Sequence, residues 1–322
     1  MSIRVLLAFL VAASFGLHSA HAQEWPDKPV RFVVPFPPGG VPDILMRIVG
    51  ERLKDRLGKP VVVENRGGAA GNIGAEVVAK SPPDGYTFLV GSSGTHAIHM
   101  TLYRTLSFDP IKDFDPVTLL AIVPNVLVVT NKFPAQTLPE FIAFARANPG
   151  RINYGSIGNG SSQHLAGAQF EKATGVSLTH VPYKTVPQVV ADLISGQIDA
   201  MFQLVPNIAR QVKAGQVRAI AVTTKARSDA LPGVPTIAES GIPDFDTAGW
   251  FGIFAPDGTP KAIVDRVSKE VGAILETPDV RERVLKYGVE PKPMSPAEFR
   301  QFTLRETDRW RVIVRSSGAQ ID

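Results

Sequence analysis

The sequence predicts an α/β protein of two lobes, each a mostly parallel sheet flanked by helices. Short apolar runs with the length of buried strands alternate with longer segments of helical periodicity. A chain of 322 residues is long enough for two domains rather than one. Its composition, 44% hydrophobic and 20% charged, is typical of an ordered globular protein.

The first lobe begins with strand–helix units. The apolar run 30–35 is followed by a helix, whose apolar residues recur every four positions from Leu45 to Leu57 until Gly58 ends it. Further elements are strands at 61–64 and 86–90, with a helix that ends at 79. Such alternation implies right-handed crossovers, and a ligand site beyond the carboxyl ends of the strands.

The middle of the chain repeats this alternation. Strands are expected at 126–130, 152–156, 178–182, 198–202 and 218–223, and helices at 138–147, 162–173, 186–194 and 208–214. After a last strand at 250–254 come three helices, at 261–276, 280–286 and 296–316. Because these helices have no strands of their own, we expect them to pack on the first sheet.

The second lobe is therefore predicted to be an insertion into the first. Lobe I comprises residues 23–124 and 225–322, and lobe II comprises residues 125–224. The chain passes between the lobes near Val123 to Val126 and near Thr223 to Lys225.

Residues 1–22 are predicted to be a cleaved signal peptide. Arg4 precedes the apolar run 5–17, and Ala20-His21-Ala22 supplies the small residues that a signal peptidase needs for cleavage after Ala22. The alternative is an uncleaved anchor, but the run is shorter than the roughly 20 residues of a membrane span. The prediction is an exported protein that is not held in the membrane.

The composition excludes several classes of function. The chain has no cysteine, which excludes disulfides, thiolate nucleophiles, cysteine-bound metals and lipid attachment after the cleavage site. A net charge of +4, scattered along the chain, does not indicate nucleic acid binding.

The loop 35–43 is the first candidate for ligand binding. Its sequence, Pro-Phe-Pro-Pro-Gly-Gly-Val-Pro-Asp, places two glycines between a strand and a helix N-terminus, where backbone N–H groups can face an anion. No Gly-Lys-Ser/Thr follows, so this is not a phosphate P-loop. The alternative is a plain turn in which Asp43 begins the helix.

Three further loops offer polar groups after strands. Residues 91–96 and 158–164 supply hydroxyls and backbone donors that suit a carboxylate, and residues 181–185 supply an aromatic ring and a cation. The alternatives are serines that cap helices, His164 packed on a helix face, and an exposed Lys184 beside a buried tyrosine.

Neither a metal site nor a cofactor is expected. His96 and His99 stand three residues apart but have no acidic third ligand nearby in the sequence. Asp109, Asp113 and Asp115 lack the spacing of a calcium loop, and turn capping explains them.

Several motifs in order resemble the Bug family, the periplasmic solute-binding proteins of tripartite tricarboxylate transport systems. They are Pro-Phe-Pro-Pro-Gly-Gly at 35–40, Val-Glu-Asn-Arg at 63–66, Gly-Asn-Ile-Gly-Ala at 71–75, Pro-Asp-Gly-Tyr at 83–86, Gly-Asn-Gly-Ser-Ser-Gln-His-Leu at 158–165 and His-Val-Pro-Tyr-Lys at 180–184. The resemblance extends from about Pro29 to near the C-terminus.

The resemblance implies a type II "Venus flytrap" protein, which is not an enzyme and has no cofactor. It would act in the periplasm as a monomer, close on a small carboxylate by a hinge motion, and present it to membrane permease subunits. The implied ligand-binding residues are Phe36, Pro38, Gly39, Gly40, Asp43, Ser92, Ser93, Thr95, His96, Asn159, Ser161, Ser162, His164, Lys184, Thr185, Gln203 and Asn207.

The chain departs from the family pattern at three of these positions. Thr185 stands where many relatives have glycine, and Gln203 and Asn207 stand where relatives often have an acidic residue and a serine. Amides both donate and accept hydrogen bonds, so the far end of the ligand is expected to differ from that of an amino dicarboxylate.

Two other functions fit the same residues. A sensor that signals a bound ligand to a membrane receptor would use the same closure. A secreted hydrolase would use Ser161 or Ser162 as nucleophile, but no Gly-x-Ser-x-Gly elbow is present, and His164 lies too close in sequence to be the usual partner.

Overall fold

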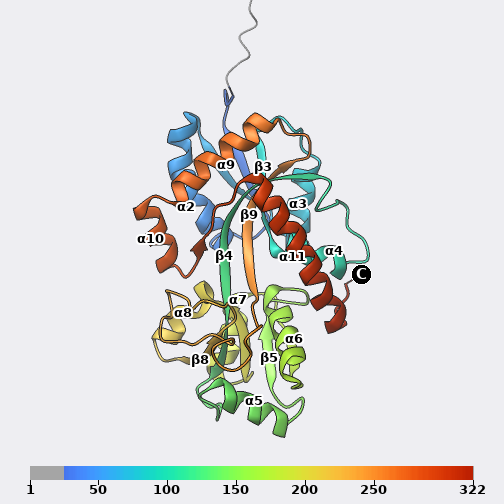
Figure 1. Ribbon diagram of the computed structural model, residues 1–322, viewed down its shortest axis with the longest axis vertical. Coiled ribbons are helices and arrows are strands. Elements are labelled where there is room, and N and C mark those ends of the chain that lie inside the picture. Colours follow the sequence, from blue (N-terminus) through green and yellow to red (C-terminus); the bar gives the residue numbers. More distant parts are fainter. Residues whose placement is uncertain (1–24, 322) are drawn as a thin grey trace, which may run out of the picture.

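A computed structural model describes residues 25–321, in two lobes stacked along the long axis of the molecule (Figure 1). The predicted signal peptide and its cleavage site lie outside the described residues. No helix within residues 25–321 combines the length and the hydrophobicity needed to cross a membrane.

Lobe I is built on one mixed sheet. Its strands, in spatial order, are β2 (Val61–Asn65), β1 (Val30–Val34), β3 (Thr87–Ser92), β9 (Ala248–Pro256), the first half of β4 (Phe114–Thr130) and β10 (Glu290–Pro291). The helices are α2 (Val41–Leu57), η1 (Ala69–Gly71), α3 (Asn72–Ala79), η2 (Gly94–Ile98), α4 (His99–Leu102), α9 (Lys261–Leu275), α10 (Pro278–Lys286) and α11 (Pro296–Ser317).

Lobe II is built on the second half of β4. On it pair β8 (Val217–Val222) and β7 (Ala200–Leu204), and the sheet continues from β7 through β5 (Asn153–Ser156) to β6 (Thr179–Pro182). Its helices are α5 (Leu138–Ala147), α6 (Ser162–Thr174), α7 (Val186–Ser195) and α8 (Val205–Lys213).

The α/β fold with helices on both lobes is confirmed, but the sheets are mixed rather than mostly parallel. In each lobe three strands are parallel, and the strands around β4 are antiparallel. The reason is β4 itself, a strand of 17 residues that pairs with β9 in lobe I and continues into lobe II (Figure 1). Its first half is not among the expected strands. Proline is untypical of strands, and β4 accommodates Pro116 at an irregularity in its pairing with β9.

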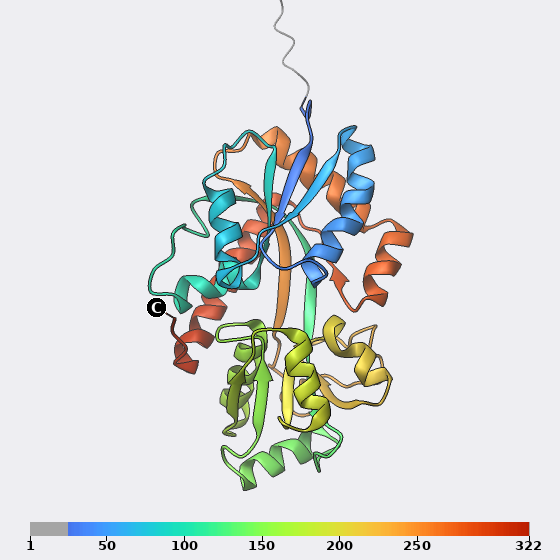
Figure 2. The same cartoon turned by 180° about the vertical axis from the view of Figure 1, so that it is seen from behind.

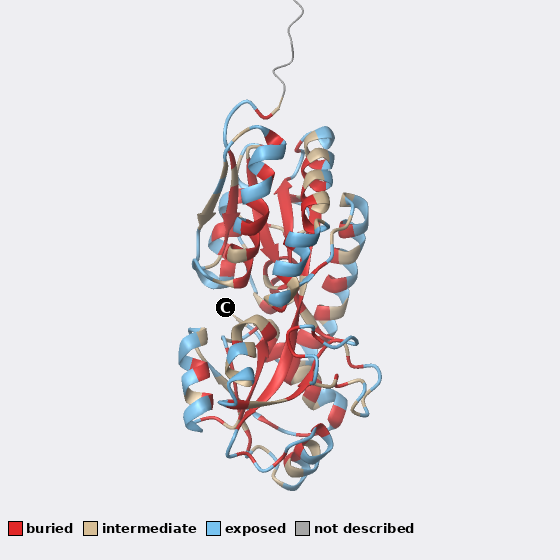
Figure 3. Ribbon diagram, turned by 90° about the vertical axis from the view of Figure 1, so that its left-hand side faces the viewer, coloured by how far each residue is buried: buried red, intermediate tan, exposed pale blue. Residues whose placement is uncertain are grey.

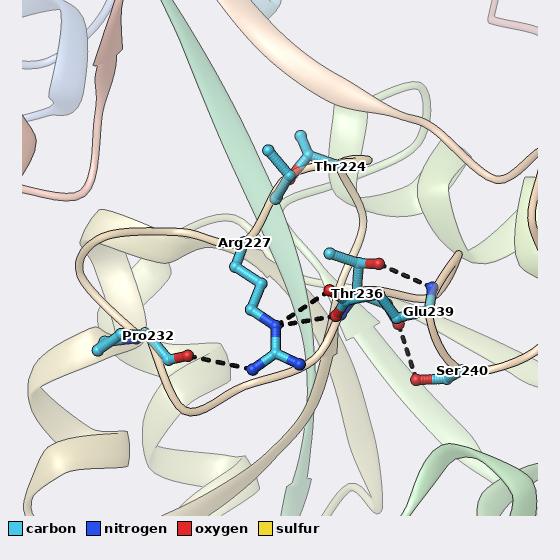
Figure 4. A network of polar contacts seen from close by, with 7 residues as sticks. Thr224, Arg227, Pro232, Thr236, Glu239 and Ser240 are labelled. Atoms are coloured by element: carbon cyan, nitrogen blue, oxygen red, sulfur yellow. Dashed lines mark hydrogen bonds and ion pairs between the residues drawn. The ribbon is translucent and has the colours of Figure 1, made fainter.

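The return of the chain to lobe I lies later than expected. The sequence predicts residues 225–246 in lobe I, but Ile237 and Phe245 lie in the lobe II core with Phe141 and Phe202. Figure 4 shows why this segment is compact: Arg227 pairs with Glu239 at 2.9 Å and donates to the Pro232 carbonyl, and Thr236 and Glu239 cap each other. The second passage is therefore Thr247 to Gly249, at the start of β9.

The C-terminal helices pack back on lobe I, as expected. Val267 and Val271 of α9 lie in one core with Leu45 of α2, while Trp310 of α11 lies in another with Val33 and Phe254. Buried strands continue from one lobe into the other through the middle of the molecule (Figure 3).

The lobes contact each other beside these strands. Leu165 of α6 is buried among lobe I residues that include Leu102, Trp250 and Trp310. Gly160, just before α6, lies against Leu102 so closely that an added Cβ would be 1.8 Å from its Cδ2. The position of α6 is thus fixed by both lobes.

Candidate functional site

The loops predicted to bind ligand face each other where the two lobes join. We call this region the crossing: Val123 to Val126 of β4 and Thr247 to Gly249. The carboxyl end of β3 reaches it, since Ser92 pairs with Phe251, and so does that of β7, since Leu204 pairs with Asn125. Because β1 and β2 are parallel to β3, and β5 and β6 run with β7, the loops that follow these strands lie at the ends of the sheets that face the crossing (Figure 2).

In the β1–α2 loop, the buried carboxylate of Asp43 is hydrogen-bonded to the backbone of the loop. Its side chain is 3% exposed, accepts from the Gly39 N–H at 2.9 Å and pairs with Arg47 at 2.9 Å. Burial raises the pKa of Asp43, but hydrogen bonds from Arg47, from the Gly39 N–H and from Asn65 outweigh it, so the pKa lies below the usual 3.8. Asp43 is therefore a charged positioning group for Gly39 and Gly40.

The other predicted residues of this loop are Phe36, which is packed, Pro38, which is exposed, and Gly40, which precedes the helix. Phe36 packs edge to face on Phe251, with ring centroids 6.3 Å apart, and Pro38 is exposed. Gly40 precedes α2 without a side-chain cap from the described residues. The N–H groups of the first turn of α2 therefore have no capping side chain.

In the loop after β3, the predicted residues divide into two groups. Ser92 and Thr95 hydrogen-bond each other's backbone and side chain, and Ser93 is 4% exposed beside them. His96 has no exposed surface and stacks on Phe254 at 3.8 Å, so its ring is part of the lobe I core. Burial, and then the neighbouring His99, lower its pKa to about 3.

In the loop before α6, Ser161 and Ser162 have different roles. The Ser161 hydroxyl donates to the Gly158 carbonyl at 2.8 Å and accepts from the His164 N–H, so it caps the helix. The Ser162 hydroxyl lies 3.4 Å from the position of a Cβ on Gly249, directly at the crossing. Asn159 is exposed.

His164 and His180 stack on each other beside this loop. Their ring centroids are 4.1 Å apart; His164 Nδ1 accepts from the Gly160 N–H, and His180 Nε2 lies 2.7 Å from Ser156 Oγ. Burial lowers the pKa of each to about 4, with a further contribution from His164 at His180. Both rings are neutral at pH 7, so neither supplies positive charge to a carboxylate.

The pair predicts a loss of stability in acid. The unfolded histidines take up protons below their usual pKa of 6.5, whereas the folded rings stay neutral down to about 4, so the free energy of unfolding falls as the pH drops through this window. We expect His180→Asn to reduce the loss between pH 7 and 4.5 by roughly 1–3 kcal/mol, measured by urea unfolding. An unchanged pH slope in the variant would contradict this.

Three amides connect α6 to β7 and α8. Gln163 accepts from Ser162 Oγ and donates from Nε2 to Gln203 Oε1 at 3.0 Å, and the same oxygen accepts from the Leu204 N–H and from Asn207 Nδ2. These donors fix the orientation of Gln203, whose Nε2 is buried without a partner among residues 25–321. Gln163 belongs to the predicted loop 158–164, although it is not among the residues expected to bind the ligand.

The β6–α7 loop supplies a free cation. Lys184 is exposed and forms no ion pair with any residue in the part of the chain that the structure describes, and Thr185 next to it is exposed. Tyr183 donates to Asp192 at 2.8 Å, which keeps the loop against α7. The structure thus has the exposed lysine beside a half-buried tyrosine.

The loops from both lobes meet, but not every predicted residue reaches the crossing. Around it lie Ser92 and Ser93 at the end of β3 and, in lobe II, Ser162 at the start of α6, Gln203 next to the end of β7 and Asn207 in the first turn of α8. His96 lies in the core, and Asp43 and Ser161 are occupied within their own loops. Asn125 at the crossing, which no sequence motif singles out, is an isolated amide in the apolar run 121–129.

Two surface cavities lie away from this site, beside α10. One, of about 250 Å³, is lined by Arg52, Glu51, Asp279 and Arg283, which pair with one another. The other, of about 370 Å³, lies between α10 and Asp229. Among residues 25–321, no three histidine or acidic side chains are grouped to hold a metal ion.

The fold and the facing loops define a two-lobed solute-binding protein. Residues 45–319 match the TctC family, the tripartite tricarboxylate transporter family receptor. The chain belongs to this family, whose members are periplasmic binding proteins and not enzymes, and the resemblance to the Bug proteins is confirmed.

Individual relatives match nearly the whole chain. Protein BugT of Bordetella pertussis is 36% identical over 301 residues, which cover 93% of this chain and 92% of that protein. An R. palustris protein solved with adipate is 39% identical, with a TM-score of 0.85 over 92% of this chain and 100% of that chain. MatC from Rhodopseudomonas palustris, with bound malate, is 33% identical, with a TM-score of 0.80 over 90% of this chain and 100% of that chain.

Proposed function

We propose that this receptor, acting as a periplasmic monomer, captures a small carboxylate between its lobes and presents the closed complex to the membrane subunits of a tripartite tricarboxylate-type transporter. The observation that carries the proposal is the meeting of strand–helix loops from both lobes at the crossing. Relatives solved with adipate and malate support a carboxylate as the ligand class.

The donors at the crossing suit an anion. The first turn of α2 lacks a side-chain cap from the described residues, as do those of α7 and α8, and backbone N–H groups at helix N-termini favour negative charge. Gln203 Nε2 adds an unpartnered side-chain donor, and the Ser162 hydroxyl, which donates to Gln163 Oε1 in this structure, can turn toward a ligand. Lys184 supplies a positive charge at the rim, so that neutral donors hold the ligand and the lysine attracts it.

The strands at the crossing suit a hinge. Within residues 25–321, only β4 and the segment entering β9 pass between the lobes. Thr223 joins them: its hydroxyl accepts from the Asn125 N–H and donates to the Thr247 carbonyl oxygen at 2.6 Å. A ligand that bridges both lobes stabilises the closed form by the difference in its affinity for the two forms.

A thermal-shift screen of small carboxylates, followed by calorimetry on two serine variants, tests this proposal. Ligands that bind the native state raise its melting temperature. We expect Ser162→Ala to lower affinity by about 3- to 10-fold, the worth of one hydrogen bond. Ser161→Ala, the matched control, removes a helix cap and should cost about 1 kcal/mol of stability instead.

Two outcomes would contradict the proposal. One is a screen in which no carboxylate raises the melting temperature while neutral solutes do. The other is a bound ligand whose affinity does not respond to Ser162→Ala. Uptake of the labelled ligand into cells that lack the receptor gene, with and without the gene restored, separates delivery to a transporter from signalling.

A further inference from the structure

The side-chain amide of Asn125 is buried and forms no hydrogen bond with the described residues. Its side chain has no exposed surface, and both Oδ1 and Nδ2 lack hydrogen-bond partners among residues 25–321. Buried amides without partners are rare in native proteins, because each unmade hydrogen bond costs free energy. The backbone of Asn125 is fully engaged with Thr223, so the strand does not need this side chain.

The position of this amide is at the crossing itself. Asn125 pairs directly with Leu204, and residues that pair across strands share a face of the sheet. Val123, two residues earlier on the same face, pairs with Gly249. The Leu204 side chain and the Ser162 hydroxyl both lie within 3.4 Å of a Cβ position on Gly249, so the amide shares its face with a proposed ligand contact.

A second orphan group lies nearby. Thr247 Oγ1 is buried and lacks a partner among the described residues, and its backbone is joined to that of Asn125 through the Thr223 hydroxyl. Two unpartnered polar side chains around one threonine indicate a place where a polar molecule completes the hydrogen bonds.

We propose that Asn125 contacts the ligand and selects for a group that both donates and accepts hydrogen bonds, such as a hydroxyl. This inference rests on the proposed function. An amide presents an NH₂ donor group and an acceptor oxygen side by side, whichever way it is oriented. A hydroxyl satisfies both, whereas a carboxylate satisfies only Nδ2 and places negative charge against Oδ1. The receptor therefore prefers a hydroxylated acid to the same acid without the hydroxyl.

Calorimetry with matched pairs of acids tests this preference. The pairs are malate and succinate, and 3-hydroxyadipate and adipate, each differing by one hydroxyl. For at least one pair we expect the wild-type protein to bind the hydroxylated acid about 5- to 150-fold more tightly, because the other acid leaves the amide unpaired. Asn125→Leu should reduce this ratio to near 1, while Asn148→Leu, which changes a hydrogen-bonded asparagine at the end of α5, should leave it unchanged.

The melting temperature of Asn125→Leu distinguishes a ligand-binding amide from one that holds a structural water. Asn125→Leu should unfold at or above the wild-type temperature, since it removes a buried polar group without partners. A wild-type ratio in Asn125→Leu, or a wild-type protein with no preference in either pair, would overturn the inference and leave the proposed function standing. The same ratio with a lowered melting temperature would show that the amide holds a structural water.

Asn125→Asp supplies a second variant if the leucine variant does not fold. The carboxylate keeps the size of the side chain but removes the donor, so both acids of a pair should bind more weakly, by at least tenfold. Unchanged affinity in Asn125→Asp would also overturn the inference. If the wild-type protein binds no carboxylate at all, the proposed function fails and this inference fails with it.

Discussion

Gly160→Ala is expected to weaken ligand binding by about 5- to 150-fold, because it forces the two lobes apart beside the proposed site. An added Cβ would lie 1.8 Å from Leu102 Cδ2, so the loop before α6 and the helix α4 cannot keep their present contact. Overpacking of this kind costs roughly 1–3 kcal/mol, and we expect most of it to fall on the closed form. Calorimetry with the carboxylate that gives the largest thermal shift measures the effect.

The control for this variant is Gly175→Ala. Both glycines have a positive φ, 74° at Gly160 and 68° at Gly175, so both variants bear the same backbone strain. Nothing lies within 4 Å of a Cβ on Gly175, which ends α6 at the far side of lobe II. We expect Gly175→Ala to lose stability and keep its affinity. Equal affinities in the two variants would show that the contact with Leu102 does not affect closure.

The elements that the sequence predicts well are those whose signals are local. The helix α5 begins at Leu138 and ends at Ala147 as expected, because Thr137 and Glu140 form a capping box and Asn148-Pro149-Gly150 ends it. The first half of β4 has no local signal of this kind. Phe114 to Pro124 are held in a strand by pairing with β9, more than a hundred residues away, and no local pattern reveals that partner.

The site shows the same division between local and distant information. The sequence correctly places the loops at the carboxyl ends of strands, since that follows from the alternation of elements. It does not reveal that His96 stacks on Phe254, or that Asn125 lies opposite Leu204, because both facts depend on how distant strands pair. For Asp43 the sequence predicts the position in the loop. It does not predict the role, because that depends on hydrogen bonds with Arg47 and the Gly39 N–H.

Asp43→Ala is expected to lower affinity by about 10- to 150-fold through the β1–α2 loop. The variant removes the acceptor for the Gly39 N–H and the partner of Arg47, hydrogen bonds that involve a charge and contribute about 1.5–3 kcal/mol each. Because Asp43 holds the loop and does not itself face an anion with like charge, its loss should disorder Gly39 and Gly40 rather than improve binding. Calorimetry at pH 7 measures the affinity, and thermal unfolding confirms that the variant is folded.

Affinity is expected to stay constant over the pH range in which the Asp43 carboxylate remains charged. The pKa of Asp43 is lowered in the folded protein, so its contribution is present above the usual 3.8 and is lost only as the pH falls through the lower folded value. Affinity in the wild-type protein should therefore not change with the ionisation of Asp43 between pH 7 and 5. Asp84→Ala, which removes an exposed acid that pairs with Lys28 elsewhere in lobe I, should bind as the wild type does. Equal losses in Asp43→Ala and Asp84→Ala would mean that net charge, and not the geometry of the β1–α2 loop, determines the affinity.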